Sequence, residues 1–131
     1  EIDFVEKIHR VYKAIKKVSS DINLKNKNTI GFIGAPWTLL VYMINQQSPK
    51  KNLKKDFFKD NFLINRILLI IEKFLKVHIK NQIDNGANII QIFDSWAGLV
   101  EENDLEDFIY SPTKKLVKFT FGVNVWCECV V

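Results

Sequence analysis

Two short runs of mostly apolar residues, each followed by a tight turn, constrain the fold of this chain more than any other feature. The first run, residues 29–33 (TIGFI), is rich in β-branched and aromatic residues and is bounded by Gly34 and Pro36. The second, residues 87–93 (ANIIQIF), stops at a polar turn that begins with Asp94. Runs of this length between turn residues are typical of buried β-strands.

The segments around these two runs carry the apolar spacing of helices. A helix is predicted in each of residues 4–18, 37–44, 56–59, 63–83, 101–110 and 113–121. Gly86, after Asp84 and Asn85, is suited to a left-handed helix end, and the tail, residues 123–131, is compatible with the start of a third strand. Strands that alternate with helices predict an α/β fold with a parallel sheet covered on both faces. Periodicity does not choose between an open doubly wound sheet and a barrel.

Composition excludes several classes of protein. The net charge of +4 comes almost entirely from lysines beside acidic residues, which indicates solvated helix faces and no nucleic-acid partner. No apolar run is long enough to span a membrane, and the first residues do not form a signal peptide. Cys127 and Cys129 form a single Cys-x-Cys pair, a weak metal signal because a zinc site needs about four ligands. So few cysteines fit a reducing cytoplasm.

Candidate functional residues follow the two predicted strands, because ligands bind at the carboxyl ends of parallel strands. The first turn is Gly-Ala-Pro-Trp (34–37) and the second is Asp-Ser-Trp-Ala-Gly (94–98). Most of these residues suit tight turns, but a hydroxyl such as that of Ser95 has little packing value there. Tyr42, on the helix after the first turn, is either a half-buried core residue or a phenol directed into a cleft. Neither a dinucleotide fingerprint nor a Walker motif is present.

The residues of both turns resemble the signatures of the uroporphyrinogen decarboxylase family. The first signature is GFIGAPWTL (31–39), followed by Tyr42 and Met43. The second runs from Gln82 through Gly86 to QIFDSWAG (91–98), in the same order and at matching separation. The resemblance covers roughly residues 4–119. It implies a (β/α)8 TIM barrel, of which this chain would be an internal fragment, because a whole barrel needs about 250 residues.

The resemblance also implies an activity and site residues. Enzymes of this family are carboxy-lyases that remove the four acetate carboxylates of uroporphyrinogen III to give coproporphyrinogen III, without a metal or organic cofactor. Tyr42, Ser95 and Phe32 are the implied substrate-binding residues. The family's arginines and central aspartate would precede this segment and its histidine would follow it, so no catalytic residue is assignable here. A cytoplasmic homodimer is the implied full-length form, and residues 1–131 would be a single partial domain.

Two alternatives stay open from the sequence. One is a corrinoid-linked methyltransferase of the same barrel superfamily, which would need a zinc site after later strands. The other is a catalytically inactive fragment. The tail, residues 123–131, does not resemble the family's next strand, so we expect it to be a truncated or frameshifted end.

Overall fold

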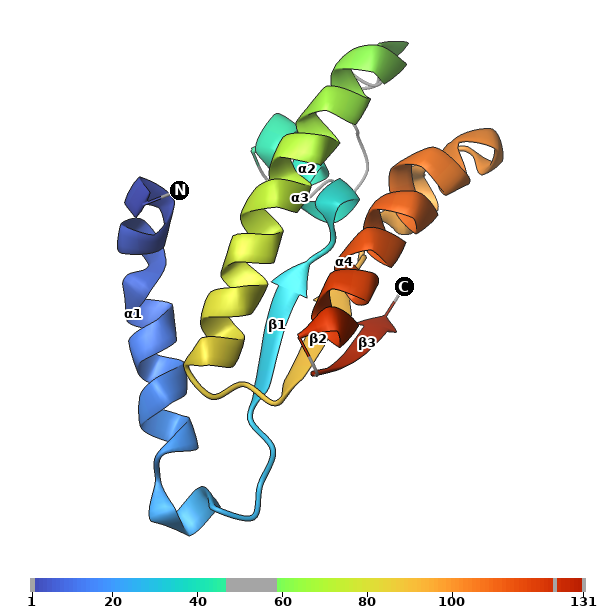
Figure 1. Cartoon of the computed structure of the whole chain (residues 1–131). Helices are drawn as coiled ribbons and strands as arrows, with labels where there is room; N and C mark the ends of the chain where they lie inside the picture. Colours follow the sequence, from blue (N-terminus) through green and yellow to red (C-terminus); the bar gives the residue numbers. More distant parts are fainter. Residues whose placement is uncertain (1, 47–58, 124, 131) are drawn as a thin grey trace.

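The computed structural model describes residues 2–46, 59–123 and 125–130, and the predicted short helix at residues 56–59 falls mostly outside them. Helices and strands alternate along the chain (Figure 1). The elements are α1 (Ile2–Ser19), β1 (Ile30–Gly34), α2 (Pro36–Asn45), α3 (Asn61–Asp84), β2 (Ile89–Phe93), α4 (Ser111–Gly122) and β3 (Trp126–Val130). The α/β class predicted from the sequence is confirmed, and the tail does form a strand.

The three strands form one parallel sheet in the order β1-β2-β3. Ile30 of β1 is level with Ile89 of β2, which in turn is level with Trp126 of β3. Each connection between neighbouring strands contains helix, as parallel strands require. The chain order of the strands is therefore also their order in space.

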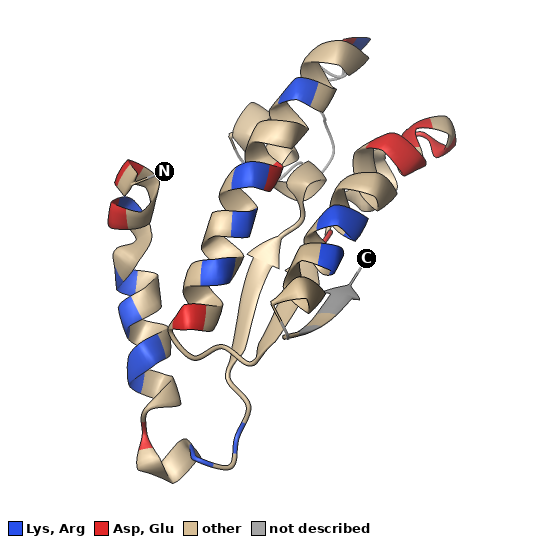
Figure 2. Ribbon diagram, in the orientation of Figure 1, with Lys and Arg blue, Asp and Glu red and all other residues tan. Residues whose placement is uncertain are grey.

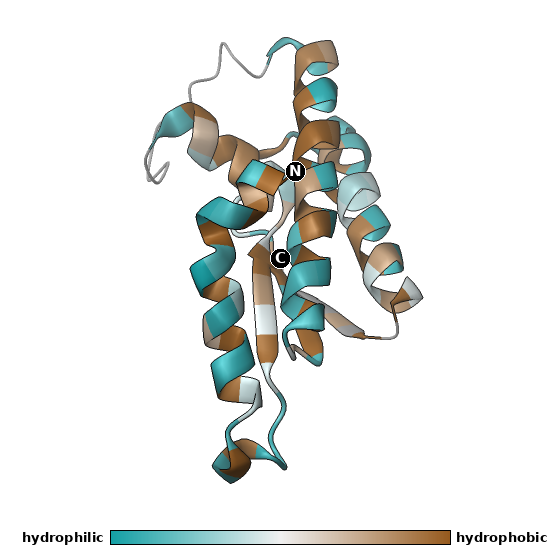
Figure 3. Ribbon diagram, turned by 60° about the vertical axis from the view of Figure 1, so that its left-hand side comes forward, coloured by the Kyte–Doolittle hydropathy of each residue, from teal (hydrophilic) through white to brown (hydrophobic). Residues whose placement is uncertain are grey.

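Helices cover one face of this sheet. Gly31 and Ile33 of β1, together with Ile90 and Ile92 of β2, are buried on that face, where α3 packs on β1 and α4 packs on β3. The opposite face is partly open: the side chain of Ile30 is 53% exposed and that of Phe32 is 66% exposed. The expectation of a sheet covered on both faces is therefore wrong for the described part of the chain. Figure 3 shows hydrophilic and hydrophobic residues alternating along the helices, as expected of amphipathic helices.

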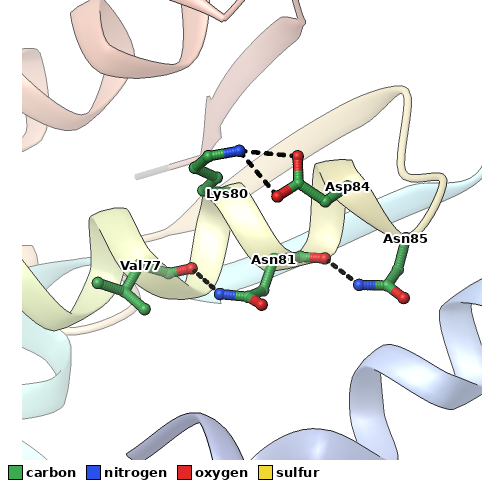
Figure 4. A network of polar contacts seen from close by, with 5 residues as sticks. All are labelled: Val77, Lys80, Asn81, Asp84 and Asn85. Carbon is green, nitrogen blue, oxygen red and sulfur yellow. Dashed lines mark hydrogen bonds and ion pairs between the residues drawn. The ribbon is translucent and has the colours of Figure 1, made fainter. Parts of the chain in front are cut away.

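A local network of polar contacts stabilises the C-terminal end of α3 (Figure 4). The Lys80 ammonium contacts both oxygens of the Asp84 carboxylate, at 2.9 and 2.8 Å. The amide nitrogens of Asn81 and Asn85 each donate to a backbone carbonyl four residues earlier. The chain then leaves the helix through Gly86, whose φ of 107° confirms the predicted left-handed position.

Two further contacts attach the other helices to α3. The Tyr12 hydroxyl of α1 lies 3.0 Å from Nδ1 of His78, whose pKa is lowered by burial. The buried Glu72 carboxylate lies 2.6 Å from Lys76 Nζ and 3.7 Å from Lys115 Nζ of α4. Glu72 thus joins α3 to α4 through an ion pair that reaches the edge of the core.

The segment after β2 differs from the expected helix at residues 101–110. It contains the 3-10 turns η3 (Ala97–Leu99) and η4 (Glu102–Asp104), then the π-helical turn η5 (Glu106–Tyr110). The Ser111 N–H donates to the carbonyl of Glu106, five residues earlier. Pro112 follows and has no N–H for the Phe108 carbonyl, which favours a widened turn at this place.

Candidate functional site

The turns that follow β1 and β2 lie next to each other at the carboxyl edge of the sheet. Gly34 and Phe93 are level with each other at the ends of the two strands. The Ala35 N–H then donates to the Phe93 carbonyl at 2.8 Å, which extends the pairing by one residue. Parallel pairing therefore places residues about sixty positions apart in the sequence at one edge.

The first turn of α2 binds the second turn through three hydrogen bonds. The Trp37 indole N–H donates to the Trp96 carbonyl at 2.9 Å. The Trp96 backbone N–H donates to Thr38 Oγ1 at 3.2 Å, and Thr38 Oγ1 donates to Asp94 Oδ1 at 2.8 Å. Pro36 begins α2, which suits its missing N–H and puts Trp37 and Thr38 in the first helical turn.

Tyr42 and Ser95 both lie at this edge with exposed side chains. Tyr42 is 42% exposed, and its ring meets the Trp96 ring edge-on with centroids 6.1 Å apart. Ser95 immediately precedes Trp96 and is also exposed. Neither hydroxyl bonds to any residue that the structure describes. Both predicted residues are therefore exposed and adjoin Trp96, Tyr42 through a ring contact and Ser95 through the chain.

Phe32 lies on the open face of the sheet, where it has an aromatic neighbour that sequence reasoning missed. The Phe93 ring, at the end of β2, is 6.2 Å from the Phe32 ring at an interplanar angle of 75°. Both residues belong to the strand positions opposite to the buried Ile33 and Ile92. The alternation of side chains along the second strand could have identified Phe93, because it places Phe93 on the face opposite to Ile92.

Gln82, buried near the end of α3, holds the backbone of Phe32. The Phe32 N–H donates to Gln82 Oε1 at 3.1 Å, and Gln82 Nε2 donates to the Phe32 carbonyl at 3.2 Å. The Gln82 amide thus bonds to both the N–H and the carbonyl of Phe32, on the side of β1 that faces away from β2. Gly31 leaves room for this contact, because a Cβ there would lie 2.6 Å from Oε1. The sequence contained Gln82 in a motif but indicated no role for it.

Asp94 points into the helical layer, away from the open face. Its side chain is 2% exposed, and its Oδ2 atom has no hydrogen-bond partner among the described residues. A cavity of about 430 Å³ between this carboxyl and α4 is lined by Asp94, Thr113, Val117 and neighbouring residues. Burial raises the pKa of Asp94, and hydrogen bonds from Thr38 oppose that shift. Asp94 is therefore a buried, half-paired acid behind the turn.

The raised pKa of Asp94 predicts how Asp94→Asn changes stability with pH. The folded state holds the proton more tightly than the unfolded state, so the acid stabilises the fold below its unfolded pKa of 3.8. That contribution is lost as pH rises through the raised folded value. Asp94→Asn should therefore be more stable than the unsubstituted chain at neutral pH, with the difference shrinking as pH falls toward 4. Urea unfolding of both proteins from pH 4 to 8 measures it; a difference independent of pH would contradict it.

Charged groups are absent from the two strands that frame the site. Lysine and arginine lie mainly on the helices, and β1 and β2 carry no Lys, Arg, Asp or Glu (Figure 2). Within residues 2–46, 59–123 and 125–130, no three His, Cys, Asp or Glu side chains gather as metal ligands. No helix in this part of the chain combines the length and apolar character needed to cross a bilayer. The open edge is thus apolar and aromatic with two hydroxyls.

Comparison with known proteins supports one family. The family model described as uroporphyrinogen decarboxylase matches residues 1–125. The uroporphyrinogen decarboxylase of Rickettsia bellii (strain RML369-C) is 38% identical over 119 residues, which are 89% of this chain and 35% of the relative. That of Orientia tsutsugamushi (strain Boryong) is 38% identical over 115 residues, 86% of this chain and 33% of the relative. The chain spans about a third of the length of these relatives. The chain therefore belongs to the uroporphyrinogen decarboxylase family.

Proposed function

We propose that this chain forms part of the substrate-binding cleft of a uroporphyrinogen decarboxylase, a carboxy-lyase of porphyrin biosynthesis. The reaction would convert the four acetates of uroporphyrinogen III to methyl groups and give coproporphyrinogen III. The observation that carries the proposal is the joining of the two signature turns at one edge. The bond from Trp37 Nε1 to the Trp96 carbonyl, at 2.9 Å, joins the two turns and supports a shared site for Tyr42 and Ser95.

The chemistry of the substrate gives each residue a role. Phe32 and Phe93 would supply an apolar wall for pyrrole rings on the open face of the sheet. Tyr42 and Ser95 would donate hydrogen bonds that orient the side-chain carboxylates of the macrocycle. Loss of carbon dioxide from an acetate needs an electron sink, which a protonated pyrrole supplies, so we propose that neither a metal nor an organic cofactor takes part.

The carboxylate that would stabilise the pyrrole cation is not provided by these turns. Preorganised charge of this kind is usually the largest catalytic contribution. Asp94 is the only acid in the two turns, and it faces Thr38 in the helical layer, where a macrocycle on the open face would not meet it. We therefore propose binding and orientation, and no catalytic acid or base, for the residues of this chain.

The uncovered sheet face fits a partial barrel. In a (β/α)8 barrel the inner strand face is covered by the other strands, and β1 and β2 would be the third and fourth of eight. Residues 1–131 would then form a single partial domain, and the tail from residue 126 lies beyond the family match. A cytoplasmic homodimer remains our proposal for the full-length protein.

Substitution at the two hydroxyls tests the proposed site. The host is a chimera in which this chain replaces the matching stretch of the Rickettsia bellii relative. Tyr42→Phe and Ser95→Ala should each lower kcat/KM for uroporphyrinogen by about tenfold, the usual effect of losing one substrate hydrogen bond, and leave measurable turnover. Tyr110→Phe is the matched control, because Tyr110 is also exposed but lies on η5, on the helical side.

Two outcomes would count against this assignment. Complete loss of turnover in folded Tyr42→Phe would mean that the phenol does more than orient the substrate. Loss of activity on adding a metal chelator would instead favour the methyltransferase alternative. The 131-residue chain alone is expected to show no decarboxylation, since its site residues only bind and orient; measurable turnover would overturn that expectation.

A further inference from the structure

Thr38 stands at the centre of a hydrogen-bond chain whose direction is fixed by its single hydroxyl proton. Thr38 Oγ1 accepts from the Trp96 backbone N–H, so its own proton is the one donated to Asp94 Oδ1. Thr38 is 4% exposed and Asp94 is 2% exposed. Water therefore has little access to either group, and an ionised Asp94 carboxylate can only accept the Thr38 proton.

This pair holds the residues on both sides of Ser95. Asp94 precedes Ser95 and Trp96 follows it, and both are bonded to Thr38 of the neighbouring α2. Ser95 itself is exposed and bonds to none of the described residues. Thr38 therefore anchors both chain neighbours of Ser95, and with them the position from which the Ser95 side chain projects.

Trp96 extends the same control to Tyr42. The Trp96 N–H is bound by Thr38, and the Trp96 carbonyl is bound by Trp37 Nε1. Both backbone groups of Trp96 are therefore hydrogen-bonded. Its ring meets the Tyr42 ring edge-on, and the two ring centroids are 6.1 Å apart. A displacement of Trp96 would thus move the surroundings of both exposed hydroxyls together.

Packing alone does not account for the pair. A buried carboxyl with one unpartnered oxygen costs stability, and apolar side chains would fill the same space without that cost. The polar pair, unlike an apolar pair, forms hydrogen bonds of defined direction between the two turns.

We propose that Thr38 and Asp94 are a positioning pair, which orients Ser95 and, through Trp96, Tyr42 toward the substrate by hydrogen-bond geometry. The inference rests on the proposed function for its consequence in catalysis. The constraint on Trp96 is a property of the fold and is tested separately.

Hydrogen exchange of the Trp96 backbone N–H in the 131-residue chain tests the constraint directly. Thr38→Val removes the acceptor and should speed this exchange by about tenfold or more, whereas Thr38→Ser keeps the acceptor and should change it by less than about threefold. Thr113→Val is the matched control: Thr113 is buried beside the same cavity, but its hydroxyl has no partner among the described residues. Equal exchange in Thr38→Val and Thr113→Val would overturn the proposal.

The chimera described above tests the consequence for catalysis. Thr38→Val and Asp94→Ala should each lower kcat/KM by about tenfold, mainly through KM, because the residues that they position bind substrate. Thr38→Ser and Asp94→Asn keep the donor and the acceptor oxygen and should restore activity to within about threefold. The double variant Thr38→Val/Asp94→Ala should be no slower than Thr38→Val alone, because Thr38→Val already removes the Thr38–Asp94 bond that Asp94→Ala removes.

Several results would distinguish failure of the pair from failure of the proposed function. Multiplying losses in the double variant, or a Thr38→Ser enzyme as slow as Thr38→Val, would overturn the positioning pair. An unsubstituted chimera that folds but does not decarboxylate would refute the proposed function. In that case the exchange of the Trp96 N–H still decides whether Thr38 holds this turn.

Discussion

Replacing Trp37 by alanine is expected to lower the free energy of unfolding by about 3–5 kcal/mol, the usual range for a fully buried aromatic side chain. Trp37 is 2% exposed, and its ring stacks on Phe108 with centroids 5.6 Å apart and an interplanar angle of 2°. The variant loses this apolar contact, leaves a cavity between α2 and η5, and removes the donor to the Trp96 carbonyl. Urea unfolding followed by far-ultraviolet circular dichroism measures the change.

Trp37→Phe separates the two contributions. A phenyl ring keeps most of the stacking on Phe108 but has no N–H for the Trp96 carbonyl. We expect it to cost about 1–3 kcal/mol, for the lost hydrogen bond and the smaller ring, because the Trp96 carbonyl keeps the Leu99 N–H as a donor at 3.0 Å. A Trp37→Ala variant as stable as Trp37→Phe would show that the stacked contact contributes little.

Gly86→Ala is expected to destabilise the chain by about 2–4 kcal/mol, the sum of a left-handed backbone penalty and overpacking. Gly86 has a φ of 107°, a conformation that residues with a Cβ adopt at a cost. An added Cβ would also overlap Oγ and Cβ of Ser19 at the end of α1. Ser19 Oγ donates to the Asn85 carbonyl at 3.1 Å, so the clash would break the contact that joins α1 to the end of α3.

Gly122→Ala provides the matched control for this substitution. Gly122 ends α4, and no atom outside its immediate surroundings lies within 4 Å of an added Cβ. The change should be neutral or stabilise the chain by up to about 1 kcal/mol, because alanine narrows the unfolded ensemble. Both variants can be followed by the same urea titration. An equal effect at the two glycines would contradict the explanation given for Gly86.

Local patterns predicted the elements wherever one segment alone decides the structure. The long helix expected at residues 63–83 is α3, because its apolar stripe and the Asp84-Asn85-Gly86 ending are contained in the segment itself. The two strands and Pro36 at the start of α2 were found for the same reason. The segment expected as one helix at residues 101–110 is helical in part but consists of a 3-10 turn and a π-helical turn, η4 and η5. The missing N–H of Pro112, which follows the segment, favours this widened turn, and its effect on the preceding carbonyls is not visible in the apolar spacing.

The sequence by itself determined the parallel α/β class, the two signature turns and the residues Tyr42, Ser95 and Phe32 as candidates. Only the tertiary structure decided which side chains hold them: Thr38 and Asp94 are 56 residues apart, and Gln82 and Phe32 are 50 apart. Periodicity reports which face of an element is buried. A hydrogen bond between distant residues depends on positions accurate to a fraction of an ångström, which are fixed only after helices and strands pack together. For that reason the positioning residues behind the turns were not visible in the sequence, although every one of them was present in it.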